Sequence, residues 1–594
     1  MNRLLIFFLG ILACGPKRPT PEVDVNTTIA TAGVQDRTLA ALLHDHWDAT
    51  MKRWPRWATR LGDHRFDDKL ADTRPERWAE MRAGVHYWRE RAETIDPDTL
   101  SSTDQVTREV FISIIRDAER NAVCLNEQWG VSPRSNAFNS FVRLAEDHTV
   151  ETVQDGHNLI SRYRAIPAAI EGEIANLRLG IEGGRTPTQE STRRTVELIS
   201  EALEQPASEW VILHPTQQEH PSWTPEEQSH FQDTLSSVVH TQIWPAFGSY
   251  RDFLRDELLP AARPAEQAGI LHLPDGPACY AAAIAEHTSL NLDADTIHQT
   301  GLSAIASIHT EFEALGTKLW DTPDIPTIFD RLRTDPELLF NTADEVQDKA
   351  EESLERARQA MPRAFGVLPQ AECVVTPIPD HEAPYTTIAY YRPPTPDGGQ
   401  PGQYFINLHD PESRPRHEAE VLAFHESIPG HHLQLSLAME QGDLPAFRRH
   451  FRSTAYTEGW ALYTERLADE LGLYSSDVDR LGMLSFDAWR AARLVVDTGI
   501  HAKGWSRSQA IAYMRDNTPL AINNIENEVD RYISWPGQAL AYKLGQIEMM
   551  QLRTEARAHL GDDFDLSAWH DEVLRVGAVP LPVLRSHLER WMNP

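Results

Sequence analysis

The chain has 594 residues, of which 41% are hydrophobic, and this is enough to bury a large core. Its 56 Lys and Arg residues against 88 Asp and Glu residues give a formal net charge of −32 at pH 7. So acidic a chain is a poor ligand for nucleic acid or an anionic membrane surface, so we expect neither as its main partner. The acidity itself is typical of a solvated surface rather than of one kind of substrate.

The N-terminus has the pattern of an export signal that ends at a lipidated cysteine. Leu4 to Ala13 form an apolar run of about ten residues, too short to span a membrane but typical of a signal-peptide core. The motif "ILAC" at its end resembles the lipobox of bacterial lipoproteins, in which cleavage exposes the cysteine for acylation. We therefore predict a signal peptide over residues 1–13 and lipidation of Cys14, with an ordinary secretory signal as the alternative. Gly15 is not the aspartate that retains such proteins in the inner membrane, so the resemblance implies an outer-membrane anchor facing the periplasm, with no other membrane contact.

A flexible tether and a scarcity of cysteine follow. Residues 14–36 carry Pro and Thr with little periodic apolarity, which predicts a tether between the lipid and the domain at 37–594. With Cys14 used for the lipid, only Cys124, Cys279 and Cys373 remain. Three scattered cysteines indicate neither a disulfide framework nor a Cys-x-x-Cys zinc site. Any metal must therefore be bound by histidine and carboxylate.

The domain is predicted to be mainly α-helical. Apolar residues in the stretch from 36 to 54 recur at one helical face, namely Leu39, Leu42, Leu43, Trp47 and Met51. Similar stripes, separated by prolines and polar clusters, recur at about 75–95, 103–125, 151–180, 190–204, 226–258, 293–318 and 342–362. They have no fixed period, which argues against a helical repeat.

The pattern changes once, between about 370 and 409. Three β-rich runs at 373–378, 386–392 and 403–408 predict a small sheet inserted before the next helices. The last run, which contains Tyr404, could form an edge strand that pairs with an extended peptide; a purely structural hairpin is the alternative. Helical stripes then continue at about 417–428, 431–441, 455–471, 479–498, 506–515, 525–533 and 537–559.

Two of these helices each place a polar residue on an apolar face. His425 shares its stripe with Phe424 and Ile428, and Glu426 lies at the margin of that stripe. A lone histidine in such a place is usually a hydrogen-bonded core residue. However, Glu458 also lies on an apolar face, where an unpaired carboxylate costs several kcal/mol. The two groups are therefore expected to meet, as ligands of a metal.

The spacing of the histidines in "HESIPGHH", residues 425–432, differs from that of an HExxH helix. On a straight helix His432 would lie about 10 Å along the axis from His425, and His431 would point to nearly the opposite side. Neither suits an ion whose nitrogen ligands lie at about 2.1 Å. Pro429 and Gly430 must interrupt the helix, and looping out two residues would bring His431 to the place of the usual second histidine.

Four segments, "HESIPGHHLQ", "TAYTEGWALYTERL", "WRAARLVVDTGIHAKGW" and "NEVDRYISWPGQALAYKLGQ", closely resemble the DUF885 family of bacterial proteins. That family is grouped with helical zinc peptidases of the gluzincin type. The resemblance extends from about residue 37 to 590 and is strongest from 402 to 548. It implies a large helical zinc-peptidase-like fold with a central cleft. It also implies one Zn²⁺ per chain, bound by His425, His431 and Glu458, with His432 as an alternative to His431.

The resemblance and the chemistry of zinc together assign roles. Glu426 would be the general base that takes a proton from the attacking water. His501, Tyr532 and Tyr542 are candidates for the group that stabilises the oxyanion, and Arg531 for this or for binding substrate. Arg493 could bind the terminal carboxylate of a peptide or pair with a buried acid such as Asp497 or Glu528.

The predicted function is that of a zinc metallopeptidase acting on short peptides. One alternative is a periplasmic binding or scaffold lipoprotein that keeps the fold without catalysis. An intact Glu426 argues against this alternative, since an inactive site does not need a general base. The other alternative is an amidase or esterase that uses the same zinc.

Overall fold

The computed structural model describes residues 29–380, 383, 387–395, 399–441 and 444–593. The predicted signal peptide, Cys14 and most of the predicted tether lie outside the described residues. The chain is mainly α-helical with one small sheet, as predicted from the helical stripes. Among the described residues, none of the helices is both long and apolar enough to cross a membrane.

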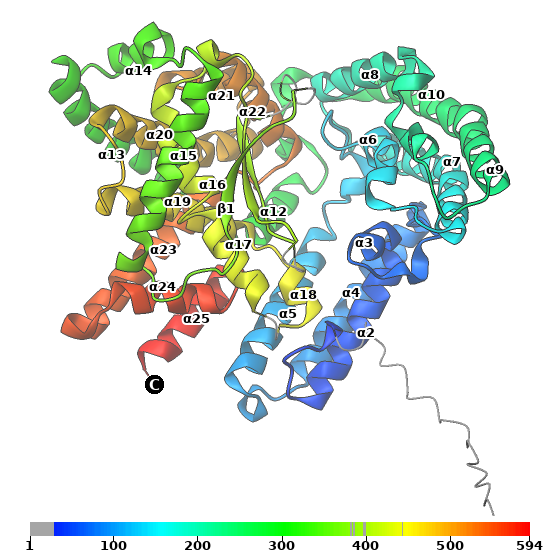
Figure 1. Ribbon diagram of the computed structural model, residues 1–594, viewed down its shortest axis with the longest axis horizontal. Coiled ribbons are helices and arrows are strands. Elements are labelled where there is room, and N and C mark those ends of the chain that lie inside the picture. Colours follow the sequence, from blue (N-terminus) through cyan, green and yellow to red (C-terminus); the bar gives the residue numbers. More distant parts are fainter. Residues whose placement is uncertain (1–28, 381–382, 384–386, 396–398, 442–443, 594) are drawn as a thin grey trace, which may run out of the picture.

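The first half of the chain forms one lobe, coloured blue to blue-green in Figure 1. Its apolar residues build a core of their own from residues between 131 and 258. Two π-helical turns, Val239–Ile243 and Leu254–Leu258, link the last helices into one nearly continuous rod. The helices are α2 (Arg37–Arg53), α3 (Pro55–Arg60), α4 (Pro75–Glu93), α5 (Ser102–Asn121), α6 (Ala137–Val142), α7 (Val153–Glu182), α8 (Gln189–Glu204), α9 (Pro225–Val238), α10 (Trp244–Phe253) and α11 (Leu259–Ala261).

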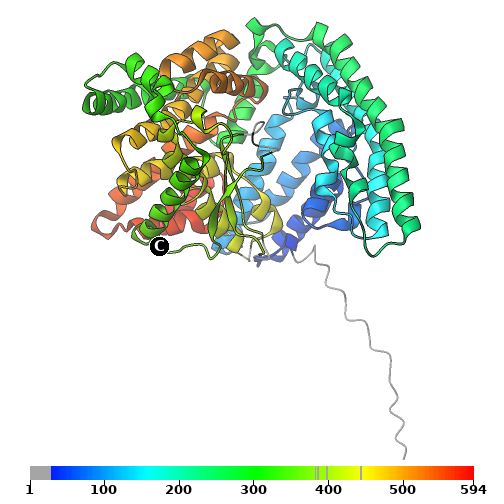
Figure 2. The ribbon, with the colours of Figure 1, turned by 45° about the horizontal axis from the view of Figure 1, so that its top comes forward.

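The second half forms the other lobe, whose core is centred on the buried aromatic residues of α19. Its helices are α12 (Gly276–Thr288), α13 (Ala294–Trp320), α14 (Ile325–Thr334), α15 (Ala343–Ala360), α16 (Ala419–Glu426), α17 (His431–Glu440), α18 (Ala446–His450), α19 (Thr454–Glu470), α20 (Asp477–Lys503), α21 (Arg507–Asn517), α22 (Ile522–Ser534), α23 (Leu540–Leu560), α24 (Leu566–Arg575) and α25 (Leu581–Met592). The sheet lies beside these helices, and Figure 2 shows the two lobes side by side as an arch.

The predicted stripes lie on helices, and α2 shows why. All five of its predicted apolar residues are buried, and the Asp36 side chain caps the helix by accepting a hydrogen bond from Leu39 N at 2.8 Å. The helix α12 was not predicted. Its sequence is alanine-rich and buried on most sides, so it carries no amphipathic stripe by which to recognise it.

The three β-rich runs form one small mixed sheet, as predicted. The strands are β1 (Cys373–Pro377), β2 (Ala389–Arg392) and β3 (Gly402–Ile406), in the spatial order β1-β3-β2. β3 pairs parallel with β1 and antiparallel with β2. The prediction that residues 403–408 form an edge strand is therefore wrong, because the hydrogen bonds of β3 are used on both sides.

A disulfide joins Cys124, just after α5, to Cys279 in α12. The three scattered cysteines indicated no disulfide framework, and this single bond was not predicted from the sequence. The two cysteines are 155 residues apart, and the packing of α5 on α12 brings them together. The spacing of the two cysteines in the sequence does not indicate that they pair. Cys373 is buried in β1 and unpaired.

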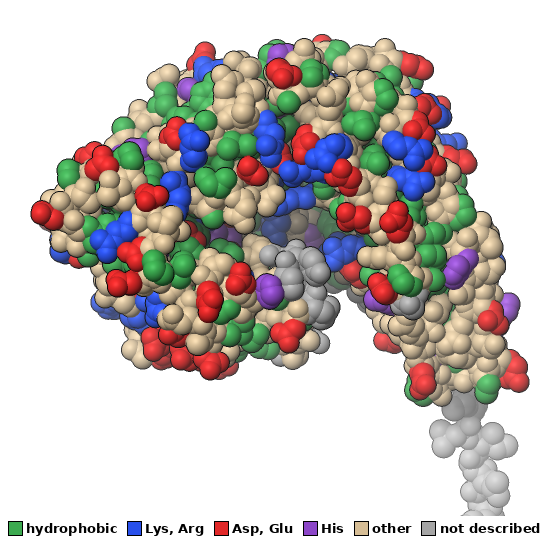
Figure 3. Space-filling model, turned by 90° about the horizontal axis from the view of Figure 1, so that it is seen from above, with side chains coloured by type: hydrophobic (Ala, Val, Ile, Leu, Met, Phe, Trp, Pro, Cys, Tyr) green, Lys and Arg blue, Asp and Glu red, His purple; other side chains and the backbone are tan. Residues whose placement is uncertain are grey.

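Between the lobes the surface is hollowed, and Figure 3 looks into this hollow. Basic side chains gather around and inside it, although the whole chain carries a net charge of −32. In the second lobe a cavity of about 600 Å³ is bounded by the sheet and by helices α15, α16, α20 and α22. This cavity is large enough for a small peptide or a comparable molecule.

Candidate metal centre

The site begins with a break between α16 and α17. Ser427 leaves the helical region, with φ −103° and ψ −112°, although its N–H still donates to Ala423 O. Gly430 comes so close to the end of α16 that a Cβ on it would lie 1.9 Å from His425 O. Only glycine fits there. The chain then starts a new helix at His431, and His432 N donates to Ser427 O at 3.0 Å.

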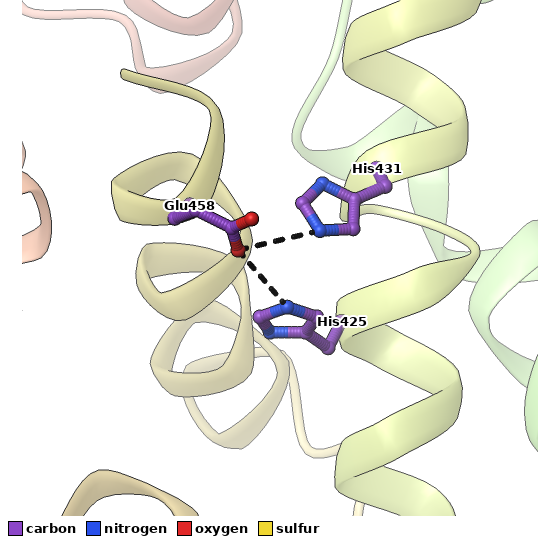
Figure 4. Close-up of side chains that lie close together, drawn as sticks. All are labelled: His425, His431 and Glu458. Atoms are coloured by element: carbon purple, nitrogen blue, oxygen red, sulfur yellow. Dashed lines mark ion pairs between the residues drawn. The ribbon is translucent and has the colours of Figure 1, made fainter. Parts of the chain in front are cut away.

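The break brings two histidines to the same side, opposite one carboxylate of α19. His425 Nε2 and His431 Nε2 each lie 3.6 Å from the same atom, Glu458 Oε2 (Figure 4). The ligand atoms of the three residues all lie within 4.8 Å of one another. These residues could together hold a metal ion, as the sequence analysis predicted.

The spacing of the donor atoms fits an ion better than direct hydrogen bonds. Zinc lies about 2.0–2.2 Å from nitrogen and oxygen ligands, which at tetrahedral angles places two ligand atoms roughly 3.3–3.6 Å apart. The two 3.6 Å separations exceed a good hydrogen bond and are within this range. His425 and His431 are buried, being 3% and 9% exposed, while Glu458 is half-buried. The three donors therefore face a small space that is largely shielded from solvent.

The electrostatics of the metal-free chain show how strongly the acids act on His425. Burial lowers its pKa, but the interactions with Glu458 and Glu465 outweigh burial and raise the pKa to about 9. Burial raises the pKa of Glu458, whereas its interactions with His425 and His431 lower it well below the ordinary value. Without a metal, His425 is thus positively charged and Glu458 negatively charged at neutral pH.

Glu465 is a part of the site that the sequence analysis missed. Its Oε1 lies 2.8 Å from His425 Nδ1, and its side chain is 1% exposed. A carboxylate that accepts from the second nitrogen of a histidine fixes the tautomer and orientation that a metal needs. A signal was present, because Glu465 follows Glu458 by two helical turns and so lies on the same face of α19.

His432 has a different task, and the choice between the two histidines is resolved. Tyr391 OH lies 2.8 Å from its Nδ1, and Ala371 O lies 3.1 Å from its Nε2. Both ring nitrogens are engaged, so His432 ties α17 to the sheet. His431 is the residue that faces Glu458, and its Nδ1 has no hydrogen-bond partner among the described residues.

Glu426 and Tyr404 lie next to the metal ligands. Glu426 is half-buried at the end of α16, and its charge is one of those that act on His425. Burial, and after it the charge of Glu426, raises the pKa of Tyr404 in β3. Tyr404 therefore lies within range of the charge of the predicted general base, in the middle of the sheet rather than at its edge.

Tyr542 reaches the site through a close packing of two helices. Gly459 of α19 meets Gly545 of α23, where an added Cβ on Gly459 would lie 2.5 Å from Gly545 Cα. Because Tyr542 precedes Gly545 by about one turn, this contact turns it toward α19. Burial and the negative charge of Glu458 raise the pKa of Tyr542, and its side chain stays half-exposed.

The hydroxyl of Tyr532 is fully used within the protein. It donates to Glu528 Oε2 at 2.7 Å and accepts from Arg493 Nε and Trp489 Nε1 at 2.9 and 3.1 Å. Its side chain is buried. With three bonds made, the hydroxyl has no hydrogen left to donate to an oxyanion.

His501 is likewise engaged by the backbone. Ile270 N donates to its Nδ1 at 3.2 Å, and its Nε2 lies 2.9 Å from Tyr532 O. Burial lowers the pKa of His501 to about 3, so the ring is neutral. His501 thus joins α20 to α22. Of the three oxyanion candidates, Tyr542 is the one whose pKa is raised by the charge of the metal ligand Glu458.

The two arginines named from the sequence meet at one acid. Arg493 Nη2 and Arg531 Nη2 each donate to Glu528 Oε2 at 3.0 Å. Glu528 is thus the buried partner of Arg493. The other acid considered, Asp497, instead accepts from Tyr280 OH at 2.6 Å and from Gly537 N.

We expect the purified protein to bind about one zinc per chain. His425→Ala, His431→Ala and Glu458→Ala should each lose it, because each removes one of three donors. His432→Gln is the matched control and should keep full zinc, since His432 faces the sheet. Elemental analysis after gel filtration measures the content. Zinc retained by any of the three alanine variants, or lost from His432→Gln, would refute the ligand set.

We also expect zinc binding to release a proton. A metal ligand must be neutral imidazole, and in the metal-free chain the pKa of His425 is raised to about 9, so at about pH 7.5 its proton must leave. Affinity should therefore rise with pH up to about 9. Calorimetry at about pH 7.5 in buffers of different ionisation enthalpy counts the protons, and an ordinary histidine, with a pKa of about 6.5, would release roughly 0.1. A count near that value would contradict the assigned coupling of His425 to Glu458 and Glu465.

Comparison with known proteins places the chain in a family. The family model described as "Bacterial protein of unknown function (DUF885)" matches residues 55–588. Among curated proteins nothing matches. The crystal structure of "the putative lipoprotein from Colwellia psychrerythraea" is similar, with 27% identity and a TM-score of 0.85, covering 94% of this chain and 99% of that one. "A putative lipoprotein of unknown function from Shewanella oneidensis", at 21% identity, has the same fold, with a TM-score of 0.74 and coverage of 93% and 98%. This chain belongs to the DUF885 family.

Proposed function

We propose that the protein is a zinc-dependent hydrolase, a metallopeptidase that cleaves short peptides. The observation that carries the proposal is the pair of Nε2 atoms at equal distance from one oxygen of Glu458, with Glu426 directly after the first histidine. A binding protein needs no carboxylate beside a metal site. A hydrolase does, because a base must remove a proton from water.

The donor set supports zinc as the metal. Two imidazoles and one carboxylate, in a largely buried site with Glu465 supporting His425, are the ligands found at catalytic zinc sites with an open position. When bound, zinc would supply Lewis acidity at a substrate carbonyl and would lower the pKa of water.

Glu426 holds and moves the proton. It follows His425 by one residue and so points about 100° away around the helix, which keeps it out of the ligand set but beside the metal. Its carboxylate would accept the proton of the attacking water and pass it to the leaving amine. The bond that forms joins water oxygen to the carbonyl carbon, and the bond that breaks is the peptide C–N bond.

Tyr542 is the donor we assign to the oxyanion. Burial and the negative charge of Glu458 raise its pKa, so its hydroxyl keeps its proton at neutral pH. A donor placed where negative charge develops contributes strongly in a site that excludes water. Tyr404 would help to position Glu426, because the charge of Glu426 acts on the Tyr404 hydroxyl.

The cavity supports short peptides as substrates. Its walls include Leu422 on the helix that carries His425, Tyr404 and Asn407 in and after β3, and Trp489 on α20. A space of about 600 Å³ accepts a few residues in an extended form, whereas a folded protein cannot enter. An amidase or an esterase would need the same metal and base, so the choice of the peptide bond is tested by digestion.

The location of the protein follows from its N-terminus and its relatives. We propose that Cys14 carries a lipid and that the domain faces the periplasm from the outer membrane. The two similar structures are described as lipoproteins. The disulfide between Cys124 and Cys279 supports export, because such bonds persist in oxidising compartments such as the periplasm.

Glu426→Gln tests the chemistry. The variant should bind zinc and fold as the wild type does, because Glu426 is not a ligand. Its kcat on a peptide should fall by about 10²–10⁴-fold, since the amide cannot take the proton. Glu458→Gln is the contrasting variant, which should lose both zinc and activity. Activity of Glu426→Gln within a few-fold of wild type would rule out Glu426 as the base.

Cys14→Ser tests the anchor. The wild type should appear in membrane fractions with an acylated N-terminus, which mass spectrometry identifies. The variant should change its processing and leave the membrane fraction, because serine cannot form the thioether. A wild-type protein found wholly free in the periplasm would leave only an ordinary secretory signal.

A further inference from the structure

Three arginines lie on α20 and α22, the helices that contribute Trp489 and Glu528 to the lining of the cavity. Arg490 and Arg493 lie on α20, three residues apart and so on one face, and Arg531 lies on α22. Arg493 Cζ lies 4.3 Å from the centroid of the Tyr542 ring. The charges of Arg490 and Arg531 also act on Tyr542. We call Arg490, Arg493 and Arg531 the arginine cluster.

Arg490 interacts electrostatically with acids of both the metal centre and the cavity. Burial lowers its pKa, whereas the charges of Glu465 and Glu458 act in the opposite direction. Burial raises the pKa of Glu418, which lines the cavity, and the charge of Arg490 opposes that rise. Trp489 lies against both α20 arginines, with ring-to-Cζ distances of 4.4 and 4.5 Å, and also lines the cavity.

The positive charge of the cluster is not balanced within the described residues. Glu528 accepts from Arg493 and Arg531, and no carboxylate lies within ion-pair distance of Arg490. The one hydrogen bond of Arg490 is a weak contact of Nη1 with Phe486 O at 3.4 Å. Three guanidinium groups therefore share one hydrogen-bonded acid.

Each of the three arginines has a buried donor without a partner among the described residues, namely Arg490 Nε, Arg493 Nη1 and Arg531 Nε. Arg490 and Arg493 are the more deeply buried, at 5% and 3% exposed. A buried charged donor without an acceptor is unfavourable, and native proteins keep few of them. Such donors are expected where a ligand supplies the acceptor. A carboxylate matches best, since its two oxygens fit the fork of a guanidinium.

We propose that Arg490 and Arg493 bind a carboxylate of the substrate and so direct cleavage to the peptide bond beside it. This proposal rests on the proposed hydrolase function. The carboxylate can come from the C-terminus of the peptide or from an acidic side chain. The C-terminus is the form that we expect, because Arg493 lies against Tyr542, the residue that we assign to the oxyanion. The enzyme would then remove residues from the C-terminal end of short peptides.

Arg490 is the better residue to change, because it has no ion pair to break. Arg490→Gln removes the charge. Arg490→Lys keeps the charge but lacks the paired N–H donors of a guanidinium group. Arg448→Gln is the matched control, a buried arginine whose hydrogen bonds go to Thr107 and to Val576 O, away from the metal centre. Thermal unfolding and zinc content establish that each variant is folded and loaded.

The activity test uses the zinc-loaded enzyme and three peptides. The first has a free C-terminal carboxylate, the second is its C-terminal amide, and the third is a C-terminal amide with the last residue changed to glutamate. Wild type and Arg448→Gln should prefer the free acid in kcat/KM. Arg490→Gln should reduce the acid-to-amide ratio about tenfold to 100-fold, the usual weight of a charge-assisted hydrogen bond, with partial recovery in Arg490→Lys. Preference for the glutamate amide would support the side-chain source. Equal cleavage of all three peptides would overturn the carboxylate proposal and leave the hydrolase in place.

A binding test decides the proposal even if no peptide is cleaved, a result that would refute the hydrolase. Calorimetry with N-acetyl-glycyl-D-phenylalanine and with its amide, on zinc-loaded wild type and Arg490→Gln, needs no turnover. The acid should bind wild type at least tenfold more tightly than the amide, and Arg490→Gln should lose this difference. Equal binding of acid and amide by wild type would refute the carboxylate site.

Discussion

The contact between Gly430 and the end of α16 is the constraint on which the candidate site depends. A Cβ at this position would lie 1.9 Å from His425 O, so the chain can turn back over the helix only with glycine there. The turn ends α16 at Glu426 and starts α17 at His431. Without it, two histidines six residues apart could not place their Nε2 atoms at one oxygen of Glu458. The interruption that distinguishes this segment from an HExxH helix therefore brings the three metal-binding side chains together.

A second close contact supplies the rest of the site. Where α19 and α23 meet at Gly459 and Gly545, their backbones approach more closely than any side chain would permit. Glu458 and Glu465 lie on the face of α19 toward the histidines, and Tyr542 comes to the same place from α23. Metal ligands, histidine support and the oxyanion donor that we assign therefore rest on two glycine contacts within one buried core. The arginine cluster adds positive charge near the carboxylates of this centre.

Much of this could be predicted from the sequence where the signal is local. The stripe of α2, the three β-rich runs and the inward-facing pair His425 and Glu458 all follow from periodicity and the cost of burying charge. What depends on packing could not be predicted. The choice of His431 over His432 requires the rotation through the break, and the central place of β3 requires knowing that β1 pairs with it. The disulfide joins two cysteines that are 155 positions apart in the sequence. The hydrogen bonds that occupy Tyr532 and His501 depend on the packing of α20 and α22. Glu465 could have been predicted, since it follows Glu458 by two helical turns and so lies on the same face of α19.

The most direct test of the metal centre is anomalous diffraction from a zinc-soaked crystal, recorded on both sides of the zinc absorption edge. One strong peak should appear about 2.0–2.2 Å from His425 Nε2, His431 Nε2 and an oxygen of Glu458. Glu465 should remain hydrogen-bonded to His425 Nδ1. A map with no peak at these three residues, or with the ion on His432, would contradict the account.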